Sequence, residues 1–241
     1  MMKKTAIVTG ASGEIGAAIS ERLITQGYHV IGTYYSNEES INELAFRLGN
    51  NFFPFQCDLS DFDAAKSLLT YIEEKQFQVE VLINNAGISI IGLLQDLTQE
   101  SWNNIWNTNV TSVISLSQSV IPIFLRQSSG KIINISSVWG NCGASCEAAY
   151  SATKGAVNTF TKAIAKELAP SNIQVNAIAC GIINTKMNSH LTDEDINEIV
   201  DEIPAGRLGT PADVAETVCA LLTASPYMTG QIITLDGGWT V

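Results

Sequence analysis

Short apolar runs rich in β-branched residues alternate along the chain with longer segments in which apolar residues recur every three or four positions. A short run bounded by polar or glycine residues is typical of a buried strand. The wider spacing, as in Ile15, Ile19 and Leu23, is typical of an amphipathic helix. The runs predicted to be strands are Ala6–Val8, His29–Ile31, Phe52–Phe53, Val81–Ile83, Ile132–Ile135, Val175–Ile178 and Ile232–Leu235.

The regular alternation of strand and helix predicts an α/β fold. Strands separated by helices pair in parallel through right-handed crossovers, which places helices on both faces of the sheet. We therefore expect a doubly wound, seven-stranded parallel sheet in three layers, α/β/α. Because no linker, charge block or repeat interrupts the pattern, residues 1–241 are expected to form a single domain. The polar residues 184–208 are either a lid over a ligand or a plain surface connection.

Composition narrows the possible partners. Lys and Arg total 13 against 24 Asp and Glu, giving a net charge of −11, so nucleic acid and membrane surfaces are not expected partners. No export signal or membrane-spanning run is expected. The cysteines are odd in number and form no CxxC pair, which favours reduced thiols in a cytoplasmic protein and predicts no metal site. They are Cys57, Cys142, Cys146, Cys180 and Cys219.

A glycine-rich turn, residues 9–16, follows the first predicted strand and precedes a helix. Its sequence is Thr9-Gly10-Ala11-Ser12-Gly13-Glu14-Ile15-Gly16. Glycines let a ligand approach the backbone closely, and the N-terminus of the helix offers free N–H groups and a positive dipole end. This arrangement favours a pyrophosphate and therefore a dinucleotide.

A second pattern places a phenol beside an ammonium group. Tyr150 and Lys154 are four residues apart in a predicted helix, so both side chains lie on one face. A neighbouring cation favours phenolate, so we expect Lys154 to lower the pKa of Tyr150 toward the range useful for proton transfer. An isolated pair of this kind is usually an ordinary surface pair. The other motifs in the chain therefore decide whether this pair is catalytic.

These motifs and their order resemble the short-chain dehydrogenase/reductase family. The resemblance implies a Rossmann-type fold and a catalytic tetrad of Asn109, Ser137, Tyr150 and Lys154. The chain departs from the family pattern at Glu14, where the family has glycine, and at Cys180, where it has proline. The resemblance implies cofactor contacts from Gly10, Ser12, Gly13, Ile15, Gly16, Tyr35, Asp58, Leu59, Asn85, Ala86, Gly87, Tyr150, Lys154, Gly181, Ile183 and Thr185.

The end of the second predicted strand bears on the choice of dinucleotide. An acid in this place usually bonds the adenosine ribose of NAD. Residues 32–37 read Gly-Thr-Tyr-Tyr-Ser-Asn and contain no acid, but they also contain no Arg or Lys to balance a 2′-phosphate. NADPH is the favoured cofactor, and NADH is the alternative.

Within the family, the chain most resembles bacterial 3-oxoacyl-acyl-carrier-protein reductases, in its length and in the segment Pro204–Gly209. That resemblance implies hydride transfer to a carrier-bound or free ketone in a homotetramer. Two places where those reductases have basic residues for an acidic carrier read Ser128-Ser129 and Ser171-Asn172 here. An enzyme of net charge −11 gains little steering toward an acidic partner.

Glu147 suggests another substrate. It lies three residues before Tyr150, so on a helix its carboxylate would face the same pocket and suit a cationic substrate; alternatively it stabilises the helix dipole. Residues 139–147 resemble reductases of the 5-aminopentanone adduct on elongation factor P, whose substrate is a ketone with a free amine. A non-catalytic dinucleotide sensor is the third hypothesis. His29 and His190 are expected to be structural.

Overall fold

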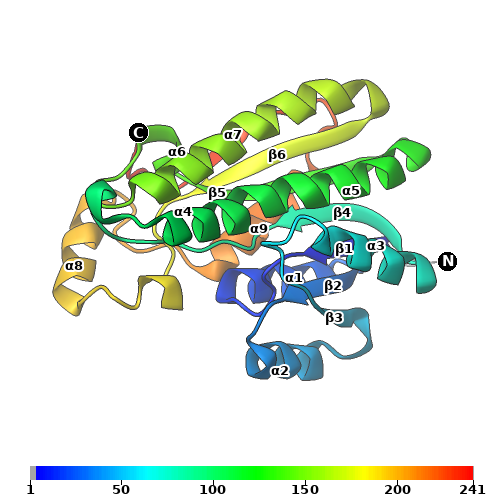
Figure 1. Cartoon of the computed structure of the whole chain (residues 1–241), viewed down its shortest axis with the longest axis horizontal. Helices are drawn as coiled ribbons and strands as arrows, with labels where there is room; N and C mark the ends of the chain where they lie inside the picture. The colour runs from blue at the N-terminus through cyan, green and yellow to red at the C-terminus, as the bar shows by residue number, and fades with distance from the viewer. Residues whose placement is uncertain (1–3, 241) are drawn as a thin grey trace.

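The computed structural model describes residues 4–240. Residues 1–3 and 241 lie outside the described residues, and so does the start of the segment in which no export signal is expected. The centre of the structure is a parallel sheet of seven strands in the order β3-β2-β1-β4-β5-β6-β7, which confirms the predicted fold class (Figure 1). The strands are β1 (Lys4–Val8), β2 (His29–Tyr34), β3 (Phe52–Gln56), β4 (Gln78–Asn84), β5 (Gly130–Ser137), β6 (Ile173–Cys180) and β7 (Ile232–Leu235).

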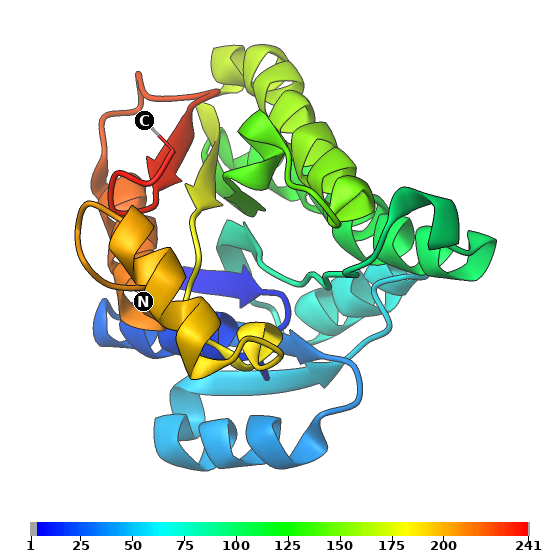
Figure 2. The ribbon, with the colours of Figure 1, turned by 90° about the vertical axis from the view of Figure 1, so that its left-hand side faces the viewer.

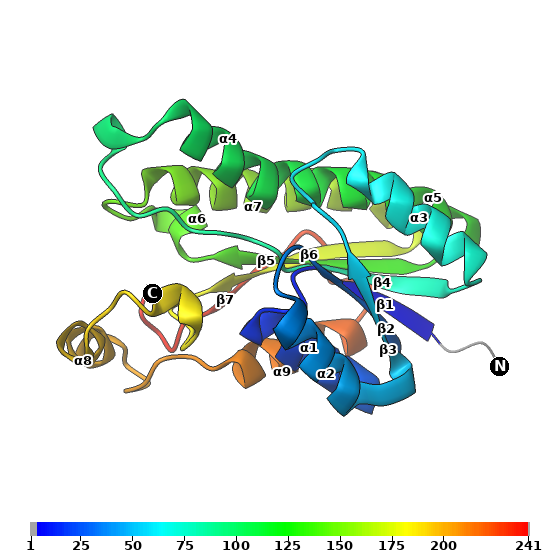
Figure 3. The ribbon, with the colours of Figure 1, turned by 60° about the horizontal axis from the view of Figure 1, so that its bottom comes forward.

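Helices cover both faces of this sheet (Figure 3). The helices on one face are α3 (Ala64–Glu74), α4 (Gln99–Trp106), α5 (Ser112–Gln127) and α7 (Ala148–Leu168). Those on the other face are α1 (Glu14–Thr25), α2 (Glu38–Leu48) and α9 (Pro211–Thr223). The short α6 (Trp139–Cys142) and α8 (Asp193–Glu202) lie near one end of the sheet (Figure 1). Short turns complete the chain: η1 (Gly49–Asn51), η2 (Leu94–Asp96), the π-helical η3 (Asn107–Thr111), η4 (Ala169–Ser171) and η5 (Lys186–Asn188).

The apolar runs of the strands fill two cores because successive side chains point to opposite faces of a sheet. In β1, Ala6 and Val8 pack on the side of α1 and α9, whereas Ile7 packs on the side of α3, α5 and α7. All three are fully buried. A fully buried aliphatic side chain contributes about 1.5–3 kcal/mol, so the two cores together hold the sheet and both helical layers in place.

One long helical stretch, residues 99–127, is apolar and long enough to cross a membrane by length and composition alone. It consists of α4, η3 and α5, and half of its apolar window is buried inside the fold. Leu116, Val120 and Phe124 of α5 pack into the core beneath α3 and α7. The stretch therefore behaves as a core helix in this fold.

The order of the strands fixes where a ligand binds. The chain adds strands outward from β1 in both directions, so the connections after β1 and β4 leave on opposite faces. In a sheet of this kind the crevice at the carboxyl ends of the strands beside this switch point is the usual binding site. The glycine turn follows β1, and the segment Asn85–Gly87 follows β4, so both lie at this crevice.

The lid segment, residues 184–208, contains η5 and α8. Helix α8 begins with a capping box, in which Thr192 and Asp195 each bond the other's backbone N–H. After α8 the chain turns back toward the C-terminal residues, where Ala205 N donates to Gly237 O at 3.0 Å. The segment is therefore tied to the C-terminal strand region at the end of the sheet that carries the crevice.

Candidate active site

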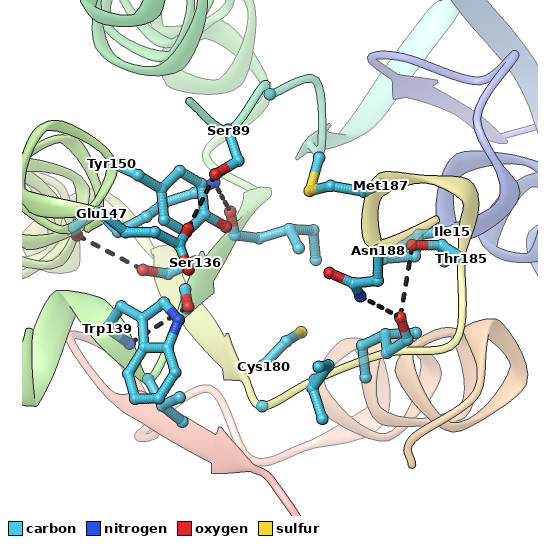
Figure 4. A pocket seen from close by; sticks show the side chains of 18 of the residues that line it. Ile15, Ser89, Ser136, Trp139, Glu147, Tyr150, Cys180, Thr185, Met187 and Asn188 are labelled. Carbon is cyan, nitrogen blue, oxygen red and sulfur yellow. Dashed lines mark hydrogen bonds between the residues drawn. The ribbon is translucent and has the colours of Figure 1, made fainter. Parts of the chain in front are cut away.

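A cavity of about 230 Å³ opens at the carboxyl ends of the central strands (Figure 4). Its walls come from the ends of β5 and β6, the start of α7, the residues after β4 and the lid segment. Among the residues predicted for catalysis or substrate, it brings together Ser137, Tyr150, Lys154 and Glu147. Of the predicted cofactor residues it also contacts Ile15, Asn85, Gly87, Gly181, Ile183 and Thr185.

Tyr150 and Lys154 project from the first turns of α7 on the same face, as their spacing predicts. The Lys154 ammonium lies 5.5 Å from the centroid of the Tyr150 ring. It donates a hydrogen bond of 2.9 Å to the carbonyl oxygen of Ile135 in β5. Lys154 is only 5% exposed, so this single backbone contact holds a nearly buried cation beside the phenol.

The structure corrects the expected direction of the Tyr150 pKa. Burial raises that pKa above the ordinary value of a phenol, and a hydrogen bond with Ser137 opposes the rise only in part. The charged form of an acid loses hydration when it is buried, and the neighbouring Cys180 and Glu147 raise the pKa of the phenol further. Burial likewise lowers the pKa of Lys154, to about 8. The phenol is therefore protonated at neutral pH and suited to donate a proton.

Asn109 stands behind the cavity in the π-helical turn η3. Its side-chain oxygen accepts from Ile88 N at 2.8 Å, and its nitrogen donates to Ile88 O at 2.9 Å and to Thr153 Oγ1 at 3.1 Å. A Cβ on Gly87 would lie 3.3 Å from the Asn109 oxygen and 3.4 Å from the Lys154 nitrogen. Asn109 thus fixes the loop after β4 against α7, although it is outside the cavity lining.

The glycine turn is packed tightly enough to require its glycines. A Cβ on Gly16 would lie 2.3 Å from the Gly10 carbonyl oxygen, which real structures do not allow, and Gly10 has a φ of 64°. Thr9 Oγ1 accepts hydrogen bonds from the backbone N–H of Asn85 and of Ala86, at 2.9 and 2.8 Å. Gly13, the N-cap residue of α1, has no side chain to cap the helix, so the turn presents open backbone to a ligand.

The predicted cofactor residues that follow β2 and β3 lie outside the cavity. Asp58 is exposed and accepts two hydrogen bonds from Ser60, at 2.9 and 2.7 Å. Tyr35 is 65% exposed at the end of β2, whereas Leu59 is buried. The predicted cofactor residues outside the cavity lining are Gly10, Ser12, Gly13, Gly16, Tyr35, Asp58, Leu59 and Ala86.

The β6 loop, residues 181–188, forms the opposite wall. A Cβ on Gly181 would lie 2.7 Å from the Asp236 side chain, so the loop leaves β6 close to the C-terminal segment. Ile183 is buried and its carbonyl accepts from Asn188 Nδ2 at 2.7 Å. Cys180, where the resemblance predicts proline, is buried beside Lys154, and burial raises the pKa of its thiol to about 12. It is therefore a neutral wall group.

Glu147 lies in the cavity wall, but not on the helix. It is the residue before α7, and its side chain does not cap that helix. Instead its carboxylate accepts a hydrogen bond of 2.8 Å from Ser89 Oγ, in the loop after β4 (Figure 4). The helical placement inferred from spacing is corrected: the carboxylate reaches the cavity from the N-cap position. The side chain makes no capping hydrogen bond, although its charge at the N-cap lies near the positive end of the helix dipole, as the alternative role requires.

Several cavity residues lie far apart in the sequence and were not predicted. The rings of Trp139 and Trp239 are 5.1 Å apart and tilted by 59°. Trp239 Nε1 donates to Glu202 at the end of α8, at 3.1 Å. His190, expected to be structural, also lines the cavity. Nothing in the spacing of these residues indicates that the C-terminal segment returns to this site.

Comparison with known proteins finds a dehydrogenase family that matches most of the chain and reductases that match nearly all of it. The sequence model of the short chain dehydrogenase family matches residues 4–196. The chain is 41% identical to the uncharacterized oxidoreductase YmfI of Bacillus subtilis, over 99% of each chain. It is 38% identical to the 3-oxoacyl-acyl-carrier-protein reductase FabG of Vibrio cholerae, over 98% of this chain and 96% of the other. The FabG protein of Staphylococcus aureus is 37% identical, over 98% of each chain.

Proposed function

This chain belongs to the short-chain dehydrogenase family, and on that premise we propose that it is an NADPH-dependent reductase of ketones. The observation that carries the proposal is the meeting of Ser137, Tyr150 and Lys154 in one cavity. A proton donor, a second hydroxyl and a cation beside a single open space are the groups that reduction of a carbonyl requires. We further propose that the whole chain is one dinucleotide-binding domain.

The residues of the crevice fit a dinucleotide. Gly10 and Gly16 leave the turn open to close approach, and the uncapped N-terminus of α1 suits a pyrophosphate. The predicted residues of the glycine turn would hold the phosphates, while Ile183 and Thr185 would lie against the nicotinamide. When bound, a reduced dinucleotide supplies hydride to the carbonyl carbon.

The chain's own residues then complete the reaction. Tyr150, protonated at neutral pH, gives its proton to the carbonyl oxygen as negative charge develops there. Ser137 donates a second hydrogen bond to the same oxygen and so orients the ketone. The Lys154 ammonium stabilises the phenolate that remains. Asn109 holds the loop after β4 in register with these groups through its bonds to Ile88.

The experiment that tests this function separates binding from turnover. Thermal-shift titrations with NADPH and NADH report which dinucleotide stabilises the fold. A panel of ketones then follows, with consumption of the reduced nicotinamide measured by absorbance. We expect stabilisation, stronger with NADPH, and turnover of at least one ketone. Stabilisation without any turnover would favour the alternative, a non-catalytic sensor, and no stabilisation by either dinucleotide would refute the proposal.

Two observations bear on a carrier-bound substrate, and they point in opposite directions. Relatives named as 3-oxoacyl-acyl-carrier-protein reductases favour a carrier-bound ketone. The net charge of −11 gives an acidic carrier protein little attraction to this surface. In either case, carrier-bound or free, the group that is reduced is a ketone carbonyl.

A second candidate substrate is favoured by the carboxylate in the cavity. Glu147 accepts a hydrogen bond from Ser89 and shares the cavity with Tyr150. A carboxylate beside the reacting group suits a ketone that carries an ammonium, such as the 5-aminopentanone adduct on elongation factor P. We propose this amino-ketone as the alternative to the carrier-bound 3-oxoacyl group.

We also propose a cytoplasmic homotetramer. The five cysteines are free thiols in the structure, which agrees with a protein of a reducing compartment. Helices α5 and α7 lie side by side on one face of the molecule (Figures 1 and 3). On α5, Ile114 and Leu125 are 37% and 45% exposed, which leaves apolar surface for a second copy. Light scattering of the purified protein measures the assembly directly.

The pH dependence of the reaction is expected to follow Lys154. Its pKa, lowered by burial to about 8, means that the ammonium is present below pH 8 and lost above it. Tyr150 stays protonated throughout because burial raises its pKa. We therefore expect kcat/KM for ketone reduction to be level near neutrality and to fall above about pH 8, by up to about tenfold per pH unit.

The variant Lys154→Arg provides the control, because a guanidinium keeps its charge throughout this range. Its kcat/KM is expected to be lower overall but to lose the fall above pH 8. A profile of the parent enzyme that stays level up to pH 10 would contradict the assignment of this limb to Lys154.

A further inference from the structure

We propose that Glu14 is a positioning residue: it fixes the β6 loop, which carries Ile183 and Thr185, against the glycine turn, and its charge weakens the hold on the dinucleotide. The inference rests on the proposed dinucleotide binding.

The contact joins two segments that are distant in the sequence. Glu14 is the first residue of α1, and Lys186 is the first residue of η5. The backbone N–H of Lys186 donates a hydrogen bond of 2.7 Å to Glu14 Oε2. In Figure 2 the yellow turn around η5 lies beside the blue segments of α1. The first turn of α1 is therefore bonded directly to the loop that follows β6.

The carboxylate is used for this bond in place of the role usual for its position. A Glu in a first helical turn commonly interacts with the N–H groups of its own helix. Here α1 has no side-chain cap, and the Glu14 oxygen points away to Lys186. The next residue, Ile15, lines the cavity together with Thr185, across from Tyr150 (Figure 4). The bond thus lies at the edge of the proposed cofactor site.

The start of the β6 loop is bonded to two other segments: Gly181 N donates to Leu235 O at 2.9 Å, and Gly209 N donates to Ile182 O at 3.0 Å. Asn184 N donates to Gly209 O at 2.9 Å, which holds the start of the loop. Within the loop, Asn188 Nδ2 donates to Ile183 O at 2.7 Å, a bond that shapes the turn but does not place it. The Glu14 contact, two residues beyond Asn184, fixes where the turn lies relative to α1. Among the hydrogen bonds of residues 4–240, it is the one that joins residues 185–188 to another element.

The same carboxylate opposes an anion at the glycine turn. A pyrophosphate at the N-terminus of α1 gains from the positive end of the helix dipole, and a negative side chain in the first turn reduces that gain. Glu14 is exposed, so the repulsion is partly screened by solvent. The residue therefore has two separable effects, one through its oxygen as an acceptor and one through its charge.

Two substitutions separate these effects. Glu14→Gln keeps a side-chain oxygen for Lys186 but removes the charge, whereas Glu14→Ala removes both. Hydrogen exchange of residues 183–191 measures the loop without any dinucleotide, and a fluorescence titration measures the Kd for NADPH. Glu43→Gln, an exposed Glu on α2, is the control for the change in net charge.

For Glu14→Gln we expect loop exchange as in the parent and a Kd lower by about two- to fivefold. For Glu14→Ala we expect exchange of the Lys186 amide to be about tenfold faster, because a hydrogen bond to a charged group is lost. Its kcat/KM should lie several-fold below that of Glu14→Gln at saturating NADPH. Glu43→Gln should change neither quantity.

Each half of the inference has its own decisive result. Equal exchange of residues 183–191 in the parent and in Glu14→Ala would refute the positioning role. An NADPH Kd that is equal in the parent and in Glu14→Gln would refute the charge effect. A parent enzyme that binds no dinucleotide would refute the proposed function instead, while the exchange comparison would still decide whether Glu14 holds the loop.

Discussion

Replacement of Tyr150 by Phe is expected to lower kcat for ketone reduction by about 10³-fold, within the range seen when a general acid is removed. The substitution deletes one oxygen and keeps the ring, so the packing at the start of α7 is preserved. The proton for the developing alkoxide then has no donor, since Ser137 needs its own proton for the hydrogen bond that orients the carbonyl. Steady-state turnover of the best ketone at saturating NADPH measures the effect.

Binding must be measured in the same variant, because a fall in turnover alone does not locate the defect. The Tyr150→Phe protein should still be stabilised by NADPH in a thermal-shift titration. Tyr71→Phe provides a matched control, because Tyr71 packs against Phe55 and Phe77, away from the cavity. Turnover by Tyr150→Phe within tenfold of the parent would remove the phenol from the mechanism.

The fold could be predicted largely from the sequence because each strand and helix depends on the apolar pattern of its own segment. The strand Ile232–Leu235 was predicted with the bounds that β7 has. For β3 only Phe52 and Phe53 were predicted, because Pro54 breaks the apolar run. The structure extends β3 to Gln56, and the proline is tolerated because β3 is an edge strand, pairing with β2 alone. The predicted family is confirmed by the whole-chain comparisons.

The electrostatics of the site could be predicted less well. The spacing of Tyr150 and Lys154 correctly places both groups on one face, but it does not reveal how far they are removed from water. Burial reverses the expected direction of the Tyr150 pKa. Contacts between distant segments were also hidden: the Trp139–Trp239 pair and the bond from Lys186 to Glu14 depend on loops that no local pattern places.

Replacement of Glu147 by Gln is expected to distinguish the two candidate substrates. For a ketone with an ammonium group, kcat/KM should fall by about 30-fold or more, because a charged partner in a partly buried site is lost. For the matched alkyl ketone, in which a methyl replaces the ammonium, kcat/KM should stay within about twofold. The measurement is the ratio of the two kcat/KM values in the parent and in the variant.

Ser89→Ala provides the control for this comparison. It removes the hydroxyl that bonds Glu147 at 2.8 Å but keeps the carboxylate and its charge. Its preference for the amino-ketone should persist, with a loss of only a few-fold from looser positioning of the carboxylate, since a single hydrogen bond contributes about 0.5–1.5 kcal/mol. A larger loss in Ser89→Ala than in Glu147→Gln would mean that the hydroxyl, not the charge, selects the substrate.

The outcome also bears on the carrier-bound alternative. A carboxylate in the cavity opposes an anionic substrate, so a phosphopantetheine-linked 3-oxoacyl group should gain from Glu147→Gln if its phosphate approaches this wall. Opposite changes for the amino-ketone and the acyl thioester would show that Glu147 selects between these two substrates. An unchanged kcat/KM for the amino-ketone would remove the amine from the proposal and leave the reductase chemistry of Tyr150 untouched.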